Sequence, residues 1–533
     1  MKNGLLREKT KIFFAVKDFK FIFKLTLPIF IQTLFFSIIS LIGSLAVSFY
    51  QRVYHIDGSY NGYYFYAISK IITVYKILVF IPIIYQLGVL VVASNLYGQN
   101  KVNKIPQVIS SAIYISLILN FICYFIMFGI SPIILSKAGA RESAIYGWTT
   151  KENYEIFKSN LSIANNNQIP IHILTNGGTF DNKIFANSHP IVLVNNELEF
   201  AQKFLRISTL DIFIVSIAYI LTSALQSIEK NKFAIVGVIA AIFFRTIWTY
   251  SILLIPKEID LMILISLETI IGGLIQLFVA YIFVNKLIIQ KQPKIPFKLS
   301  WNSKYIKEVL KIGAPIAIET GIWFTSQYFI AASIPYAISQ DKFIGIWRAV
   351  NNGYDVFNSF TLALGYVTSV IVAVEIGKQD FNRAHSLGRS AFKLGLYAQI
   401  IFSILGITMT YPMLAIYSID KQLIDSLGYS IMAIFMVKAI FDVGNLTILR
   451  GLWGANDVWM PILVALTTMI GLQLSTIYFV GIYQNTSKAS TKLSAETYII
   501  IISLIALVDP IARSTLFNLR WNSRVWQKYA KRL

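Results

Sequence analysis

The sequence predicts an all-α protein that crosses a membrane many times, with about twelve helices arranged as two six-helix bundles. Three observations support this prediction: the composition, the apolar stretches of bilayer-spanning length, and short phrases that recur in both halves. Hydrophobic residues make up 56% and charged residues 14% of the 533 positions, and the mean hydropathy is +0.63. A soluble domain of this composition would carry more apolar surface than its interior could bury.

About 20 helical residues are needed to cross a hydrocarbon core of roughly 30 Å. Apolar stretches of this length lie at 21–49, 70–97, 106–136, 202–227, 232–255, 260–285, 308–336, 343–376, 388–416, 426–450, 458–483 and 495–519. We therefore divide the chain into an N-terminal segment 1–20, a first half 21–285, a linker 286–307, a second half 308–519 and a basic tail 520–533.

The formal charge of +21 sets the expected orientation. Lys and Arg concentrate in the short segments on one side of the membrane, which the positive-inside rule assigns to the cytoplasm. The charge is thus an orientation signal, and we expect no nucleic-acid partner. We expect both termini to be cytoplasmic, the first helix to act as an uncleaved anchor, and the protein to reside in the cell membrane as a monomer.

Parts of the first half recur in the second half. PIFIQT at 28–33 matches PIAIET at 315–320, and YGQNKVNKIPQVISSA, from residue 97, matches IGKQDFNRAHSLGRSA, from residue 376. The second match pairs Gly98 with Gly377. A weaker match pairs Leu225 with Leu452, at a shorter spacing that an insertion at 138–200 explains. Two six-helix halves in the same orientation predict a pseudo-two-fold axis along the membrane normal, with a cavity between the halves.

The insertion 138–200 is polar, and we expect it outside the cell. It contains IPIHILTNGGTFDNKIF, where an Asn-Gly-Gly turn between β-prone runs predicts a small hairpin. His172 and His189 lie there, but two histidines without a placed carboxylate or cysteine are typical of solvated side chains rather than of a metal site. We assign the insertion no function.

Sequence motifs also bear on the type of activity. Cys123 is the single cysteine, so the chain has no intrachain disulfide, and we interpret Cys123 as a packing residue. The chain has no phosphate-binding G-x-x-x-x-G-K-[ST] loop and no evident catalytic triad. We therefore expect a protein that is not an enzyme, has no cofactor and uses an ion gradient.

Acidic residues within apolar stretches are the candidates for ion coupling. A carboxylate in a low-dielectric site can hold either a proton or Na⁺, and an ionised Asp at a helix centre costs roughly 2.5–3.5 kcal/mol on insertion scales. Such residues are therefore seldom present for packing alone. The candidates are Asp211, Glu268, Glu319, Asp355, Glu375, Asp442 and Asp509.

Several candidates have a basic residue that could neutralise them instead. The possible pairs are Asp509 with Arg513, Glu375 with Lys378, Glu268 with Arg245, and Asp442 with Lys438. We expect the first two pairs to be structural and leave the other two open between pairing and function. Asp355 follows Asn351 and Asn352 on a polar stripe that we expect to face the cavity. Asp211 could pair with Arg206, but only poorly at a spacing of five residues.

The repeated hexapeptide places Glu319 opposite Gln32 in the other half. Glu319 is then the ionisable member of a Gln32–Glu319 pair across the pseudo-axis. The alternative is that both are merely polar residues near the membrane surface.

Three motifs together resemble a known family. Pro315 follows an Ile-Gly in the seventh stretch, GYVTSVIVAVEIG at 365–377 closes the eighth, and LWGAND at 452–457 with Pro461 follows the tenth. Their order and spacing resemble those of the multidrug and toxic compound extrusion (MATE) transporters, over nearly the whole chain except 138–200. The resemblance implies a V-shaped pair of six-helix bundles that exports organic, often cationic, compounds in exchange for Na⁺ or H⁺.

The resemblance also implies site residues. LWGAND stands at the family's LRGAGD pattern with its Arg replaced by Trp453, and Asp442 matches the acid eleven residues before that position in many members. Asn445 and Thr447 resemble the polar positions that follow it. Two positions depart: Gly43 stands at the acid of many proton-coupled members, and Trp323 stands at the Glu of many Na⁺-coupled members. Glu319 lies one turn from the latter, so the coupling ion stays open.

The main prediction is therefore a secondary active exporter of small organic compounds that works by Na⁺ or H⁺ antiport. One alternative is a flippase for lipid-linked or anionic lipid substrates, because basic residues fall in or near the helices: Lys24, Lys76, Arg245, Arg348 and Lys438. A passive channel would favour rings of charge repeated in both halves, whereas Asp442 faces Val215 in the repeat.

Overall fold

The computed structural model describes most of the chain. The described residues are 18–53, 80–137, 142–150, 171–172, 188–252, 261–290, 301–338, 341–417, 419–486 and 492–530. Apart from three strands between 142 and 196, these residues are almost entirely helical.

Six long helices form the N-terminal bundle. They are α2 (Phe19–Val53), α4 (Phe80–Gly98), α5 (Ile105–Lys137), α7 (Glu197–Ser227), α8 (Asn231–Ile252) and α9 (Leu261–Val284). A 3₁₀ turn, η1 (Val102–Lys104), precedes α5, and a π-helical turn, η2 (Asn285–Ile289), follows α9.

The C-terminal bundle also has six spans, but π-helical turns break two of them. Three spans are α10 (Ser303–Ala337), α11 (Asp341–Gly377) and α12 (Phe381–Thr408), the last followed by α13 (Thr410–Ala415). The tenth span joins α14 (Lys421–Leu423), η3 (Ile424–Gly428), α15 (Tyr429–Val443), η4 (Gly444–Ile448) and α16 (Leu449–Gly454). The eleventh joins α17 (Trp459–Ala465), η5 (Leu466–Leu474) and α18 (Ser475–Thr486), and the twelfth is α19 (Ala495–Asn522), with α20 (Gln527–Ala530) after it.

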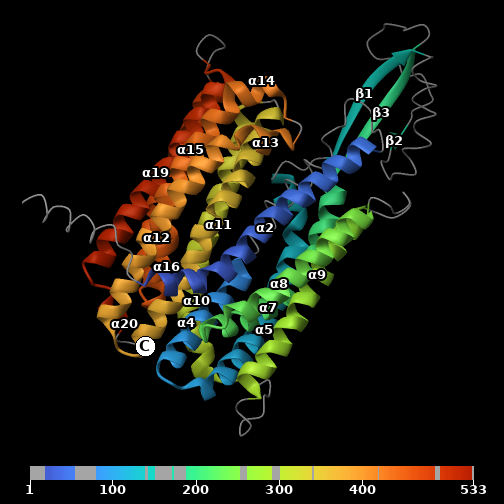
Figure 1. Cartoon of the computed structure of the whole chain (residues 1–533). Coiled ribbons are helices and arrows are strands. Elements are labelled where there is room, and N and C mark those ends of the chain that lie inside the picture. Colours follow the sequence, from blue (N-terminus) through green and yellow to red (C-terminus); the bar gives the residue numbers. More distant parts are fainter. Residues whose placement is uncertain are drawn as a thin grey trace, which may run out of the picture.

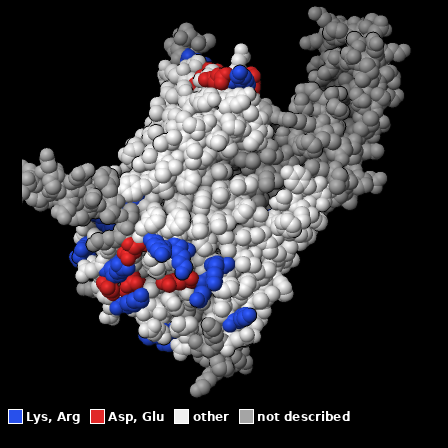
Figure 2. All heavy atoms as spheres, viewed as in Figure 1, with Lys and Arg blue, Asp and Glu red and all other residues white. Residues whose placement is uncertain are grey.

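The helices have the length and surface of membrane spans. Within the described ranges, 10 helical segments are long and apolar enough to cross a bilayer, and α2 and α10, with 35 residues each, complete the predicted set of twelve. Large apolar side chains are exposed on the outer helices, for example Phe121, Phe125, Ile401 and Phe479. Figure 2 shows an uncharged belt between charged groups near the two ends of the molecule.

The two bundles meet across a pseudo-two-fold axis. Helix α2 packs on α11 and α10 packs on α4, and these are equivalent contacts because α2 corresponds to α10 and α4 to α11. The bundles lie together near the C-terminus and diverge toward the end that carries the strands (Figure 1). Gly98 and Gly377, which the sequence alignment pairs, touch each other where α4 and α11 end. The predicted axis therefore passes between these two glycines.

Turn geometry confirms two of the repeat matches, the one that pairs Gly98 with Gly377 and the one that pairs Leu225 with Leu452. Asn100 and Gln379 stand at matched positions and have φ of 59° and 64°, and the matched residues Glu229 and Asn456 have φ of 60° and 62°. The same backbone hydrogen bond follows each: Lys101 N donates to Leu96 O at 2.8 Å, and its counterpart in the second half, Asp380 N, donates to Glu375 O at 2.9 Å. We call the end of the molecule that carries these four turns the turn end.

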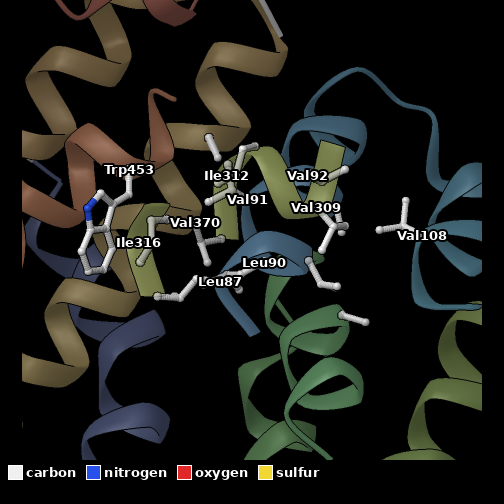
Figure 3. Close-up of a cluster of buried hydrophobic side chains, with 14 of the residues drawn as sticks. Leu87, Leu90, Val91, Val92, Val108, Val309, Ile312, Ile316, Val370 and Trp453 are labelled. Atoms are coloured by element: carbon white, nitrogen blue, oxygen red, sulfur yellow. The ribbon is translucent and has the colours of Figure 1, made fainter. Parts of the chain in front are cut away.

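An apolar core joins the bundles near the turn end. Figure 3 shows Leu87, Leu90 and Val91 of α4 among Val309, Ile312 and Ile316 of α10, with Val370 of α11 and Trp453 of α16 beside them. Glycines let the backbones approach closely here: a Cβ at Gly88 would lie 2.5 Å from Val309 O. The two bundles therefore share one core.

One sequence expectation needs correction, and another falls mostly outside the described residues. The ninth span begins at Phe381 rather than 388, because Asp380 caps α12 by accepting a hydrogen bond from Arg383 N at 2.8 Å. In the insertion, β1 (Glu142–Thr150) pairs antiparallel with β3 (Ser188–Asn196) along its whole length, and β2 (Ile171–His172) pairs with the other edge of β3. Strand β3 thus pairs mainly with β1, and most of the predicted hairpin, including its Asn-Gly-Gly turn, lies outside the described residues.

Candidate functional site

A π-helical turn interrupts the tenth span directly after Asp442. Helix α15 ends at Val443, and η4 covers Gly444–Ile448. Such turns occur often at functional sites, where the extra residue redirects neighbouring side chains. Here Asn445, the second residue of the turn, donates from Nδ2 to Asp442 Oδ1 at 2.8 Å. The turn therefore shapes the surroundings of the predicted acid.

Neutral groups hold the Asp442 carboxylate from the facing helix. Tyr354 of α11 donates its hydroxyl proton to Asp442 Oδ2, and Asn358 Nδ2 donates to the Tyr354 oxygen at 2.9 Å. Lys438 Nζ lies 4.0 Å from Asp442 Oδ2, and 4.5 Å from the centre of the Tyr354 ring. The short contacts of Asp442 are thus hydrogen bonds from neutral donors, and Lys438 lies at the edge of ion-pair distance.

A second buried group of charges lies nearby on α10 and α19. Arg513 NH1 donates to Glu319 Oε1 at 2.8 Å, and Arg513 Nε lies 3.7 Å from Asp509 Oδ2. Thr468, in the π-helical turn η5, donates its hydroxyl proton to Asp509 Oδ1 at 2.5 Å. All four side chains are buried. The expected Asp509–Arg513 ion pair is therefore present, and Arg513 makes a shorter second contact with Glu319, which the sequence did not indicate.

The two groups form one polar network within the C-terminal bundle. Arg513 and Asp509 both interact electrostatically with Asp442, and Asp509 also interacts with Lys438. We call the set the C-bundle network; its members are Glu319, Tyr354, Lys438, Asp442, Asn445, Thr468, Asp509 and Arg513. Its members lie on five of the six spans of the bundle: the seventh, eighth, tenth, eleventh and twelfth. A change of charge at one acid is therefore felt by all of these helices.

Asp355 lies where the two bundles part. Ser37 of α2 donates its hydroxyl proton to Asp355 O at 3.2 Å, and one turn toward the turn end Thr33 donates to Ser359 O at 2.9 Å. Ser359 is buried, whereas the Asp355 side chain is exposed. The Asp355 side chain is thus exposed beside the contact between α2 and α11.

The structure separates other predicted site residues from this network. Gln32 is buried on α2, and Glu319 is ion-paired inside its own bundle, so the expected Gln32–Glu319 pair is replaced by Glu319–Arg513. Thr447 donates its hydroxyl proton to Val443 O at 2.6 Å, within η4. Asp211 is buried in the N-terminal bundle, with Oδ1 2.7 Å from the place of a Cβ on Gly273 of α9.

Of the two remaining predicted ion pairs, one forms and the other does not make a direct contact. Lys378 Nζ donates to Glu375 Oε1 at 2.9 Å, as expected for an interfacial pair. Glu268 instead accepts from the Thr249 hydroxyl at 3.0 Å, and Arg245 donates to Thr269 O at 3.2 Å, so the two interact only through their charges. Across the described part of the chain, no three His, Cys, Asp or Glu side chains are grouped as metal ligands.

Sequence reasoning missed Tyr354, Asn358 and Thr468. All three are uncharged, and a search for intramembrane charge passes over them. Arg513 was identified only as a neighbour of Asp509 on the same helix. The one available signal for Tyr354 was its position next to Asp355 on the polar stripe of α11.

Comparisons with known proteins find a family match and relatives described as transporters or multidrug resistance proteins. The MatE family profile matches residues 315–479, which contain Glu319, Tyr354 and Asp442. The chain is 24% identical over 269 residues to the "Uncharacterized transporter YisQ" of Bacillus subtilis (strain 168), covering 49% of this chain and 54% of that protein. It is 26% identical over 189 residues to the "Probable multidrug resistance protein NorM" of Bacillus anthracis, covering 35% of this chain and 40% of that protein. The matched region thus spans about half the length of these curated relatives or less.

Solved structures share the fold over nearly the whole chain. A MOP superfamily transporter from Pyrococcus furiosus, reported under the words "reverse polarity of binding pocket suggests different function", aligns with a TM-score of 0.69 at 10% identity, covering 96% of this chain and 97% of that one. An outward-facing multidrug resistance MATE family transporter aligns with a TM-score of 0.68 at 11% identity, covering 95% and 96%. At these identities the likeness establishes the fold alone.

Proposed function

Because the chain is a MATE family protein by its fold and its MatE domain, we propose that it is a secondary active exporter. It moves organic cationic or amphipathic compounds out of the cell in exchange for Na⁺ or H⁺, by alternating access of the space between the bundles. The observation that carries this proposal is Asp442, a buried carboxylate at a π-helical turn whose short contacts come from neutral donors.

Asp442 has the properties that ion exchange requires. An exchanging group must change its charge or its ligands between two states of the protein. A carboxylate held by hydroxyl and amide donors can take a proton or Na⁺, because these donors can reorient and offer their oxygen atoms instead. In the network, Glu319 and Asp509 already face Arg513, so Asp442 is the acid best placed to exchange.

A cationic substrate fits the charges near the space between the bundles. The exposed Asp355 carboxylate lies where α2 and α11 separate, and it would attract a positive group. Buried basic residues are engaged within the protein: Lys438 beside Asp442, Arg513 with Glu319, and Arg450 with Leu362 O at 3.2 Å. This supports an exporter of cations over the flippase alternative, which needs basic groups directed at an anionic head group.

We propose that the protein lies in the cell membrane, with the turn end in the cytoplasm and the strands outside the cell. Among the described residues, Lys101, Lys230 and Lys378 lie in the turns at this end and Arg520 pairs with Asp457 there, which is the arrangement of the positive-inside rule. The bundles diverge away from that end (Figure 1), so the structure corresponds to an outward-facing state.

An ion pair at the turn end links the bundles in this state. Arg383 of α12 donates to both carboxylate oxygens of Asp18, which precedes α2, at 2.8 and 2.9 Å. The repeat places Tyr305 opposite Asp18, so a symmetric copy of this pair cannot form. Nearby, burial raises the pKa of the Glu229 carboxyl, and Lys378 of the other bundle opposes the rise. Alternating access requires these contacts to separate.

We expect Asp18→Asn to shift the protein toward the state with a separated turn end. An exposed bidentate pair contributes about 0.2–1 kcal/mol, which corresponds to a roughly 1.4- to 5-fold change in the ratio of the two states. Electron–electron double resonance between spin labels at Lys232 and Ser523, with Cys123 replaced by Ala, measures that ratio. The exchanged pair Asp18→Arg with Arg383→Asp should restore it. Equal distance distributions in all variants would show that the pair does not bias the equilibrium.

Dye efflux from living cells tests the proposed function. Cells that express the protein in a host without its own exporters should accumulate less of a fluorescent organic cation than cells with an empty vector. Dissipating the Na⁺ and H⁺ gradients with ionophores should abolish the difference, because the energy comes from those gradients. Efflux that persists after the gradients are dissipated would contradict antiport.

A further inference from the structure

Arg513 occupies a closed, cation-binding cage inside the C-terminal bundle. Its guanidinium lies 2.8 Å from Glu319 Oε1 and 3.7 Å from Asp509 Oδ2, and NH1 lies 3.6 Å from Met469 Sδ. All three charged side chains are at most 6% exposed. Side chains of α10, α19 and η5 form the cage, and the guanidinium of Arg513 is the cation inside it.

The other oxygen of Asp509 is also satisfied. The Thr468 hydroxyl donates to Asp509 Oδ1 at 2.5 Å, from within the π-helical turn η5. Arg450 interacts electrostatically with Glu319, but its own guanidinium lies 3.8 Å from the Tyr366 ring centre and bonds to Leu362 O. Arg513 is therefore the cation in direct contact with both acids.

Two buried carboxylates that share one guanidinium cannot both remain ionised without a counter-charge. In the low dielectric of the bundle, such a pair would bind a proton or a small cation such as Na⁺. Arg513 supplies that charge permanently. Asp442 has no ion pair as short as the 2.8 Å contact between Glu319 and Arg513, since Lys438 Nζ lies 4.0 Å from it.

We infer that Arg513 determines which acid exchanges ions: its guanidinium stands in for an exchangeable cation at Glu319 and Asp509 and so confines ion exchange to Asp442. The inference rests on the proposed antiport only for its role in transport. Its physical content is that the Glu319–Asp509 cage becomes a binding site for Na⁺ or H⁺ once the guanidinium is removed.

The test is the thermal stability of purified Arg513→Gln in detergent, measured with NaCl against choline chloride and at pH 8 against pH 5.5. Binding of the missing counter-charge stabilises the folded state. We expect the unfolding midpoint to rise by on the order of 2 °C or more with Na⁺, with acid, or with both. Whichever condition acts identifies whether the cage takes Na⁺ or H⁺.

Two further variants make the result specific. The neutral triple variant Glu319→Gln, Asp509→Asn and Arg513→Gln has no acid in the cage and should respond to Na⁺ and pH as the wild type does. Arg513→Lys keeps the positive charge and should also behave as the wild type does. If Arg513→Gln responds no more than the triple variant, the inference is wrong.

A milder variant keeps the test decisive if the uncompensated acids prevent Arg513→Gln from folding. Glu319→Gln with Arg513→Gln leaves Asp509 alone, with its bond from Thr468, and should still be stabilised by acid or Na⁺ relative to the triple variant. No difference between these two variants would overturn the inference. None of these measurements involves transport, so a failure of the proposed export activity would be recognised separately.

Discussion

Asp442→Asn is expected to abolish gradient-driven transport while the protein stays folded. The amide oxygen can still accept the Tyr354 hydroxyl proton, but the side chain no longer gains or loses a charge. Its NH₂ group would face the Asn445 amide, which can turn to offer its oxygen instead, so we expect a loss of stability of no more than about 1 kcal/mol. Export measured in proteoliposomes should fall to the rate seen without any gradient.

A matched control lies on the same span. Asp425→Asn makes the same chemical change at an exposed position in η3, so export should remain at the wild-type rate. Gradient-driven export that survives Asp442→Asn, in protein shown to be folded, would remove Asp442 from the coupling mechanism. It would also undermine the role that we infer for Arg513.

Gly98→Leu is expected to have the largest effect on the fold. A Cβ at this position would overlap the carbonyl oxygen of Val374, which belongs to the backbone of α11 and cannot turn aside. Overpacking of a rigid contact costs about 1–3 kcal/mol and occasionally more, and the bundles would have to separate at the turn end. The unfolding midpoint should fall, and the labels at Lys232 and Ser523 should move apart.

The pseudo-symmetry supplies an internal check. A Cβ at Gly377 would overlap the Asn95 carbonyl oxygen, so Gly377→Leu should cause a loss of similar size. Gly129 of α5 has open space around it, and Gly129→Leu is the control that should cost little. If Gly98→Leu were as stable as Gly129→Leu, the close crossing of α4 and α11 would be wrong.

The fold could be predicted from the sequence because the bilayer fixes how long an apolar span must be. The repeat was also readable, since both halves keep a glycine, Gly98 and Gly377, at the point where their helices cross too closely for a side chain. The strand pairing was not readable. Strand β1 meets β3 across an intervening segment, and local turn signals do not report such long-range pairs.

The candidate site was predictable only in part. Asp442 stood out as an acid inside an apolar span that also matches a family position. The partner of Glu319 could not be predicted, because Arg513 lies 194 residues away in the sequence. Spacing along the last helix indicated only Asp509, one turn away, as a partner of Arg513. Tertiary packing of α10 against the eleventh and twelfth spans decides that choice. The coupling role of Asp442 and the importance of Asp355 remain predictions.

The most direct test of ion-coupled export uses purified protein in proteoliposomes loaded with a fluorescent organic cation. An inward H⁺ gradient, an inward Na⁺ gradient and no gradient are compared, with no ATP present. We expect one of the two inward gradients to drive the dye out of the proteoliposomes. The wild type should lose this export when the gradient is collapsed. Dye movement that is the same with and without either gradient, in folded protein, would contradict ion-coupled export.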